Sequence, residues 1–135
     1  GIEPVNRYEN HLINTGWQAV EMIERVGADN IFVHLDTYHM NIEEKDSAKA
    51  ILAAGSKLGH FHACGCDRGT PGNDHISWDT IVPALKKIGY DQSVVIESFT
   101  PDVKVIAKAA SIWRKFEPSQ EDIAIKGIQF LKSRF

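Results

Sequence analysis

Asn30-Ile31-Phe32-Val33-His34-Leu35-Asp36 is the segment that most directly indicates the fold class. It is a short apolar run that ends in a carboxylate, and it has the length and composition of a buried parallel strand. Comparable runs lie at Leu58–Cys64 and Ser93–Glu97, at intervals of about 30 residues, which is the length of one strand-helix unit. Ile2–Pro4 has the character of a strand end. We therefore expect four parallel strands, with the first reduced to a stub.

Helical patterns fill the intervals between these strands. Thr15 opens a capping-box sequence, and apolar residues then recur at helical spacing until Gly27. Asp46 or Ser47 can cap a second helix, and Ser77 can cap a third. The residues expected to be buried by these three helices are Ala19, Met22, Ile23 and Val26; Ala48, Ile51, Leu52 and Gly55; and Trp78, Ile81, Val82 and Leu85.

Two more helices are expected toward the C-terminus. The first covers Val103–Trp113, and the second opens at Pro118–Ser119. The inward face of this last helix is expected to hold Ala124, Gly127, Ile128 and Leu131. Strands that alternate with helices predict an α/β fold with a parallel sheet. Nothing in the sequence divides the chain, so residues 1–135 are expected to form a single domain. The irregular stretch Gly65–Ile76 has a length typical of functional loops.

Composition limits the classes of protein and of partner. The chain has 135 residues, of which 43% are hydrophobic and 24% charged, and its net charge is −3. Basic residues form no long run, so no nucleic-acid partner is expected. No apolar stretch approaches the roughly 20 residues of a membrane span. Cys64 and Cys66 are too close together to staple a fold, and we expect them to be reduced thiols in a cytoplasmic protein.

Side chains that can bind a metal end all four strands: Glu3, Asp36, His62 and Glu97. In a parallel barrel these ends converge on one face, where active sites lie. Three carboxylates and one imidazole suit Mn²⁺, Mg²⁺ or Co²⁺ better than a closed zinc site. The alternative is that each acid caps the next helix or lies in water. The repetition at the period of the fold favours a shared cation, which would also offset repulsion among the carboxylates.

A histidine-cysteine zinc site is a further alternative. Side chains alternate along a strand, so His60, His62 and Cys64 should share one strand face. Because the sequence has no second Cys/His cluster, buried and unreactive thiols are favoured over a zinc site.

Four segments resemble one family of sugar enzymes. Leu35–Glu44, with the sequence LDTYHMNIEE, resembles the L-D-T-[FY]-H-M-N-I-E-E segment of the D-tagatose and D-psicose (allulose) 3-epimerases almost letter for letter. The other matching segments, in chain order, are Glu3–Asn10, Gly59–His62 with Arg68 and Pro71-Gly72, and Val95–Glu97. The resemblance covers essentially the whole chain. More loosely, the chain resembles members of the xylose-isomerase-like barrel superfamily.

The resemblance implies an isomerase that inverts C3 of a free ketose through an enediolate. It implies that Glu3, Asp36, His62 and Glu97 bind a divalent metal, Mn²⁺ foremost, with Mg²⁺ or Co²⁺ as alternatives. Such a metal would polarise the C2 carbonyl. Glu3 and Glu97 would form the acid/base pair, one removing the proton and the other returning it to the opposite face.

The resemblance also implies a pocket and a larger assembly. Glu9, His39 and Arg68 would hold the sugar hydroxyls near its carbonyl end. The fold would be the C-terminal half of a (β/α)8 TIM barrel, and a complete barrel typically takes about 250 residues. Because an open half barrel exposes sheet edges, we expect a homo-oligomer or another association that completes the barrel, or else a piece of a longer protein.

Two rival functions stay open. One is a metal-dependent hydrolase of the same superfamily, such as an abasic-site endonuclease, which calls for more metal-binding histidines and a basic groove. The other is a non-catalytic half-barrel module that retains the ligands.

Overall fold

A three-stranded parallel sheet with helices along one side forms the framework of the computed structural model, which describes residues 1–135. The strands are β1 (Val33–Asp36), β2 (Leu58–Ala63) and β3 (Val94–Ile96), in the order β1-β2-β3. Ile2 adds one parallel bridge to Val33 at the outer edge of β1. The expected α/β fold, parallel strands and N-terminal stub are therefore confirmed, although β1 begins later than expected.

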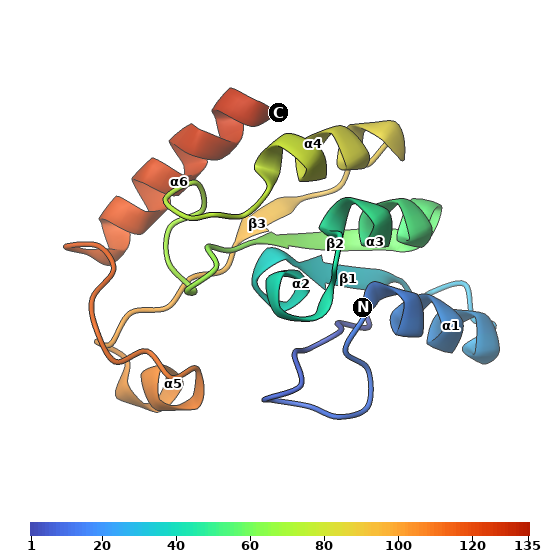
Figure 1. Cartoon of the computed structure of the whole chain (residues 1–135), viewed down its shortest axis with the longest axis horizontal. Helices are drawn as coiled ribbons and strands as arrows, with labels where there is room; N and C mark the ends of the chain where they lie inside the picture. The colour runs from blue at the N-terminus through green and yellow to red at the C-terminus, as the bar shows by residue number, and fades with distance from the viewer.

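The helices fall into two groups in Figure 1. Helices α1, α3, α4 and α6 form a row along the sheet, whereas α2 and α5 lie toward the ends of the strands. Their bounds are α1 Gly16–Val26, α2 Thr37–Glu43, α3 Ser47–Ala54, α4 Trp78–Lys87, α5 Lys104–Ala109 and α6 Gln120–Arg134, with a 3-10 turn at Gly55–Lys57. No helix combines the length and apolar composition needed to cross a membrane.

Local sequence explains where most of these helices begin and end. Thr15 forms the expected capping box with Gln18, and Gly27 ends α1 in the left-handed conformation, at φ 65°. The side chain of Asp46 caps α3 by accepting a hydrogen bond from the Lys49 amide. Ser77 stands at the N-cap of α4, as expected, but its side chain makes no capping hydrogen bond.

The helix α2 was not expected, and α5 is shorter than expected. Asp36, the last residue of β1, also caps α2, because its Oδ1 accepts a hydrogen bond of 2.6 Å from the Tyr38 amide. The helix expected at Val103–Trp113 already ends at Ala109. Ser111 adopts a left-handed φ of 57°, and the Ile112 amide turns back to the Ala107 carbonyl.

The expected inward faces are right for α4 and partly wrong elsewhere. All four expected residues of α4 are buried. Leu52 and Val26 are exposed, and α3 instead buries Ala50 and Ala54, whose small side chains suit a helix that packs between α1 and α4. The physical reason is that the positions of the two neighbouring helices decide which face of α3 is covered. The apolar pattern of one helix carries no information about those positions.

The last helix shows the same kind of correction. Ala124 and Ile128 are exposed, while Ile123, Gly127 and Leu131 are buried. At Gly127 an added Cβ would lie 2.8 Å from the Ile96 side chain, so α6 approaches β3 most closely there. The buried face of α6 is centred on Gly127, because the helix lies closest to the sheet at this residue.

The two faces of the sheet differ in chemistry. Val33, Leu35, Phe61 and Ala63 are at most 1% exposed and form the core with the helices. Since side chains alternate along each strand, the opposite face carries histidines and carboxylates. The pairing shifts by one residue between Val33 and His34, which leaves Gly59 unpaired, as in a bulge.

We expect Phe61→Ala to lower the free energy of unfolding by about 3–5 kcal/mol, because it leaves a cavity at the centre of this core. Urea unfolding followed by circular dichroism measures the loss. Val105→Ala, at a side chain that is 82% exposed, serves as the control and should change stability by less than about 0.5 kcal/mol. Equal effects of the two substitutions would contradict the assignment of the core.

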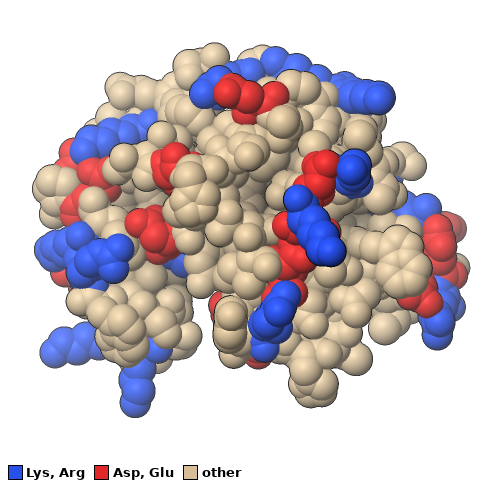
Figure 2. Space-filling model, in the orientation of Figure 1, with Lys and Arg blue, Asp and Glu red and all other residues tan.

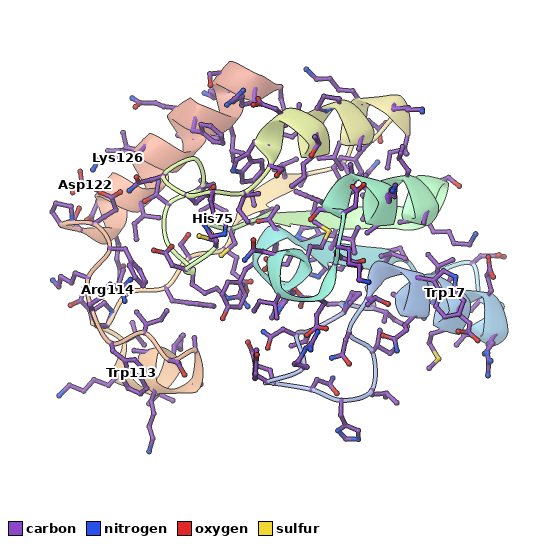
Figure 3. The ribbon with its side chains drawn as sticks, in the orientation of Figure 1. Trp17, His75, Trp113, Arg114, Asp122 and Lys126 are labelled. Atoms are coloured by element: carbon purple, nitrogen blue, oxygen red, sulfur yellow. The ribbon has the colours of Figure 1, made fainter.

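Charges are mixed on the molecular surface. On the face shown in Figure 2, acidic and basic side chains are interspersed. Some pair across elements, as Arg134 of α6 does with Asp79 of α4 at 2.6 Å. The exposed side chains of Trp17 on α1 and Trp113 after α5 lie on opposite sides of the molecule in Figure 3.

Candidate active site

The four expected metal ligands converge at the ends of the strands. One ligand atom from each of Glu3, Asp36, His62 and Glu97 lies within 4.8 Å of those of the other three. His62 Nδ1 is at the centre, 3.2 Å from Glu97 Oε2, 3.7 Å from Asp36 Oδ2 and 4.0 Å from Glu3 Oε1. The register accounts for this, since Asp36 of β1 pairs with His62 of β2 and Glu97 directly follows β3.

Two of these atoms support a cation at this position. Glu3 Oε1 and His62 Nδ1 are buried and form no hydrogen bond, because the 3.2 Å contact of Nδ1 with Glu97 Oε2 lacks hydrogen-bond alignment. Buried polar atoms without partners cost free energy, so such atoms need an explanation. A divalent cation coordinated by both would satisfy them, and three carboxylate ligands would supply the compensating charge. The donor set thus fits a hard divalent metal.

Burial and the charges of neighbouring groups shift the pKa values of all four ligands. Burial raises the pKa of Glu3 to about 7, and the charges of Asp36 and Glu97 add to the effect. Burial also raises the pKa of Asp36. Burial would raise the pKa of Glu97, but His62, Asp36 and Arg68 together hold it below its ordinary value. Burial would lower the pKa of His62, but Asp36 and Glu97 outweigh it and raise that pKa to about 9. Strongly shifted groups in a cleft are typical of functional sites.

Arg68 links the ligand cluster to the neighbouring cleft. Its Nη1 donates hydrogen bonds to Asp36 Oδ2 at 2.8 Å and to Glu97 Oε2 at 2.7 Å. Its guanidinium lies over the ring of Tyr38, 4.0 Å from the centroid. Arg68 has a left-handed φ of 68°, and its carbonyl accepts a hydrogen bond from the Phe99 amide. The Gly65–Ile76 loop therefore fixes a buried guanidinium beside two carboxylates.

His39 and Arg68 present two hydrogen-bond donors to one place. Burial, followed by the charge of Arg68, lowers the pKa of His39 to about 4, so its ring is neutral at pH 7. The Asn6 amide donates to His39 Nδ1 at 3.1 Å, which leaves the ring proton on Nε2. That Nε2 lies 2.8 Å from Arg68 Nη2, which is also a donor, so the two N–H groups face each other unfavourably with no acceptor between them. An oxygen atom beside both would accept from both.

The remaining expected residue, Glu9, lies in the same cleft. Its Oε1 accepts a hydrogen bond of 2.7 Å from Asn6 Nδ2. The cleft encloses about 340 Å³ and is lined by Glu3, Glu9, His39, Arg68 and Glu97 together with an apolar wall. The structure therefore brings all three expected substrate-binding side chains beside two of the four metal ligands. Their roles remain predictions.

Sequence reasoning missed part of this cleft. The apolar wall consists of Val5, Phe99, Val105, Ile106, Ala109 and Ala110. Most of it belongs to α5 or the segment before it, and no spacing rule predicts that this short helix returns to the strand ends. Asn6, which is 1% exposed, had a signal, because it stands inside the matching segment between Glu3 and Glu9.

The sulfur atoms take no part in a metal cluster. The side chain that groups with His60 and His62 is His34, not Cys64. Cys64 is fully buried, and its amide donates to Thr37 Oγ1 at 2.7 Å. Cys66 lies on the loop after β2, with its Sγ 3.4 Å from Nδ1 of His75, which Figure 3 labels. The alternative of a histidine-cysteine zinc site thus lacks its sulfur ligand.

Replacing Arg68 by lysine is expected to lower the free energy of unfolding by about 1–3 kcal/mol, measured in urea. The lysine ammonium keeps the charge. It cannot reproduce both the hydrogen bonds to Asp36 and Glu97 and the stacking of the planar guanidinium on Tyr38. Arg114→Lys is the matched control, since Arg114 is exposed and stacks only on Phe116. An unchanged stability of Arg68→Lys alongside this control would contradict the linking role of Arg68.

Parallel strands flanked by helices, with potential ligands gathered at the strand ends, are typical of TIM-barrel enzymes. A sequence model of one such family, described as the xylose isomerase-like TIM barrel, matches residues 1–134. The chain belongs to the xylose isomerase-like TIM barrel family.

The most similar relatives include several sugar 3-epimerases. The chain is 41% identical over 134 residues to a probable ketose 3-epimerase of Synechocystis sp., covering 99% of this chain and 47% of that protein. It is 38% identical to an L-ribulose 3-epimerase of Methylomonas sp., covering 99% and 48%. A solved L-ribulose 3-epimerase matches with a TM-score of 0.94 and 38% identity, covering 99% of this chain and 46% of that one.

The structural match confirms that the chain has the fold of the C-terminal half of a TIM barrel, as expected. A D-psicose 3-epimerase from Clostridium cellulolyticum, solved with D-tagatose, also matches, with a TM-score of 0.90, 38% identity and coverage of 98% and 47%. The chain spans about half the length of the relatives it matches.

Proposed function

We propose that this chain carries the metal-binding and acid/base residues of a ketose 3-epimerase, which inverts C3 of a free ketose through an enediolate. The observation that carries this proposal is the convergence of Glu3, Asp36, His62 and Glu97 within 4.8 Å, beside a cleft. The relatives named ketose 3-epimerase, L-ribulose 3-epimerase and D-psicose 3-epimerase support the same reaction class.

A divalent metal fits the donor set. Glu3, Asp36, His62 and Glu97 would hold it, and Mn²⁺ is proposed first, with Mg²⁺ or Co²⁺ as alternatives, because three of the four ligands are carboxylates. When bound, the metal supplies Lewis-acid polarisation of the carbonyl next to the carbon that is inverted.

Two carboxylates are proposed to move the proton. Inversion needs one group to remove the C3 proton and another to return it from the opposite side. Glu3 and Glu97 suit these roles, because both line the cleft and they come from opposite ends of the row formed by the stub, β1, β2 and β3. In the reverse reaction their roles exchange.

Three other residues are proposed to hold the sugar. The donor nitrogens of His39 and Arg68 lie 2.8 Å apart. Both would donate a hydrogen bond to the sugar oxygen at the carbonyl end, on which negative charge develops. The carboxylate of Glu9 would accept a hydrogen bond from a hydroxyl. The cleft of about 340 Å³ lies within the range of small-molecule sites.

The test is proton exchange at C3. The 135-residue chain is loaded with Mn²⁺ and incubated in D₂O with D-fructose, D-psicose, D-tagatose or L-ribulose, and proton NMR follows the C3 signal. We expect metal-dependent loss of this signal and appearance of the C3 epimer for at least one sugar. Metal binding without any exchange would favour a non-catalytic half-barrel module and contradict the proposal.

We also propose that the chain functions in an assembly that completes a barrel, with a second copy of the chain as one way to complete it. The polar face of the sheet is not covered by the helix row, and a closed barrel needs eight strands. Light scattering after gel filtration should show a species larger than the monomer of 15.1 kDa. A monomer that still exchanges C3 protons would contradict the proposed assembly.

Both cysteines are free, which supports the further proposal of a cytoplasmic location.

A further inference from the structure

A second group of potential ligands lies next to the carboxylate cluster. One ring nitrogen from each of His34, His60 and His62 lies within 4.8 Å of those of the other two. The rings pack edge to face, with centroids 4.1 to 5.0 Å apart. Interior layers of a TIM barrel are usually made of branched apolar side chains. Three imidazoles at this position therefore call for a reason other than packing.

His34 supplies an independent sign of a ligand. Its Nε2 is buried and has no hydrogen-bond partner. The nearest carboxylate oxygen, Glu3 Oε1, is 3.7 Å away, beyond hydrogen-bond distance. An imidazole nitrogen left unpaired beside two other imidazoles is suited to coordinate a metal, since neutral imidazole is the form that binds metals.

The chemistry of these donors differs from that of the first cluster. Three nitrogens suit late transition metals such as Zn²⁺, and three histidines with an open fourth position form a known type of zinc coordination. Three carboxylates with one histidine suit harder ions. Neighbouring clusters on one face of the sheet would thus select different metals.

We propose that His34, His60 and His62 form a second, nitrogen-only metal site, and that Zn²⁺ at this site excludes a metal from the carboxylate site. Exclusion follows because both sites need His62, and a neutral imidazole has a single lone pair to give. This second step rests on the proposed function, which makes His62 a ligand of the carboxylate cluster. Zn²⁺ would accordingly act as an inhibitor that displaces the activating ion.

The experiment separates the two sites with single substitutions. Isothermal titration calorimetry measures Zn²⁺ and Mn²⁺ affinity for the 135-residue chain and for His60→Leu, His34→Leu and the control His11→Leu, whose histidine is exposed on the N-terminal loop. The paramagnetic resonance signal of free Mn²⁺ reports displacement when Zn²⁺ is added to the Mn²⁺-loaded chain. Circular dichroism shows whether each variant keeps its fold. Because His60→Leu and His34→Leu test the same site, the test still stands if one of them does not fold.

We expect Zn²⁺ to release Mn²⁺ one for one from the unmodified chain. His60→Leu and His34→Leu should weaken Zn²⁺ binding by about tenfold or more, while His60→Leu leaves Mn²⁺ affinity within about threefold and His11→Leu changes neither. Zn²⁺ affinity that is unchanged in both variants, or that is lost in Asp36→Asn instead, would overturn the proposal, because zinc would then occupy the carboxylate site. Failure of the unmodified chain to bind Mn²⁺ would count against the proposed function instead.

Discussion

Glu97→Gln is expected to lower the rate of C3 proton exchange by about 10²- to 10⁴-fold, the usual contribution of a general acid or base. Glutamine keeps the shape of the side chain but cannot take up or return a proton. It can still accept the hydrogen bond that Arg68 Nη1 donates to Glu97 Oε2, at 2.7 Å, so the loop should stay in place. The loss should therefore be chemical rather than structural.

The measurement must separate chemistry from metal binding, because Glu97 is also a proposed ligand. Exchange is followed by NMR in D₂O at Mn²⁺ concentrations that saturate each variant. Glu121→Gln makes the same change on the exposed first turn of α6, away from the cleft, and should exchange at the rate of the unmodified chain. A Glu97→Gln variant that matches this control would show that Glu97 is not one of the acid/base pair.

Asp36→Asn is expected to remove the stabilisation that a bound metal gives. Asp36 is 1% exposed, and its Oδ2 lies 3.7 Å from His62 Nδ1. Asparagine keeps an oxygen for the α2 cap at the Tyr38 amide but loses the charge that a cation requires. We expect Mn²⁺ affinity to fall by about 100-fold or more, on the scale on which even outer-shell changes cost 10- to 100-fold.

Unfolding with and without Mn²⁺ tests this directly. A ligand at 100 times its dissociation constant stabilises a fold by about 2.7 kcal/mol, and Asp36→Asn should lose nearly all of that gain. Asparagine also weakens the hydrogen bond that Arg68 Nη1 donates to Asp36 Oδ2 at 2.8 Å, so the stability of each chain without metal is measured first and only the gain on adding Mn²⁺ is compared. Asp29→Asn, in the exposed turn after α1, should keep the full metal effect. An Asp36→Asn variant that keeps it too would exclude Asp36 as a ligand.

Local patterns were enough to predict the strands and the candidate ligands. The apolar run ending at Asp36 is short and continuous, and the chain repeats it at the period of a strand-helix unit. Since the carboxyl ends of parallel strands meet on one side, the sequence alone predicts that Glu3, Asp36, His62 and Glu97 lie together. The capping box at Thr15 and the buried face of α4 were predictable for the same reason, because both depend on residues within a few positions of each other.

The neighbours of each element depend on how the whole chain packs. The inward faces of α3 and α6 depend on α1, α4 and β3, which are distant in the sequence, so Ala50 and Ile123 are buried where Leu52 and Ile128 were expected. The return of α5 to the cleft, and the approach of His34 to His60 and His62, likewise arise from contacts between different elements. Local sequence accounts for the order of the elements and the chemistry at their ends. The packing of distant elements determined the pocket and the second cluster, because burial and distance are properties of the whole fold and no local spacing contains them.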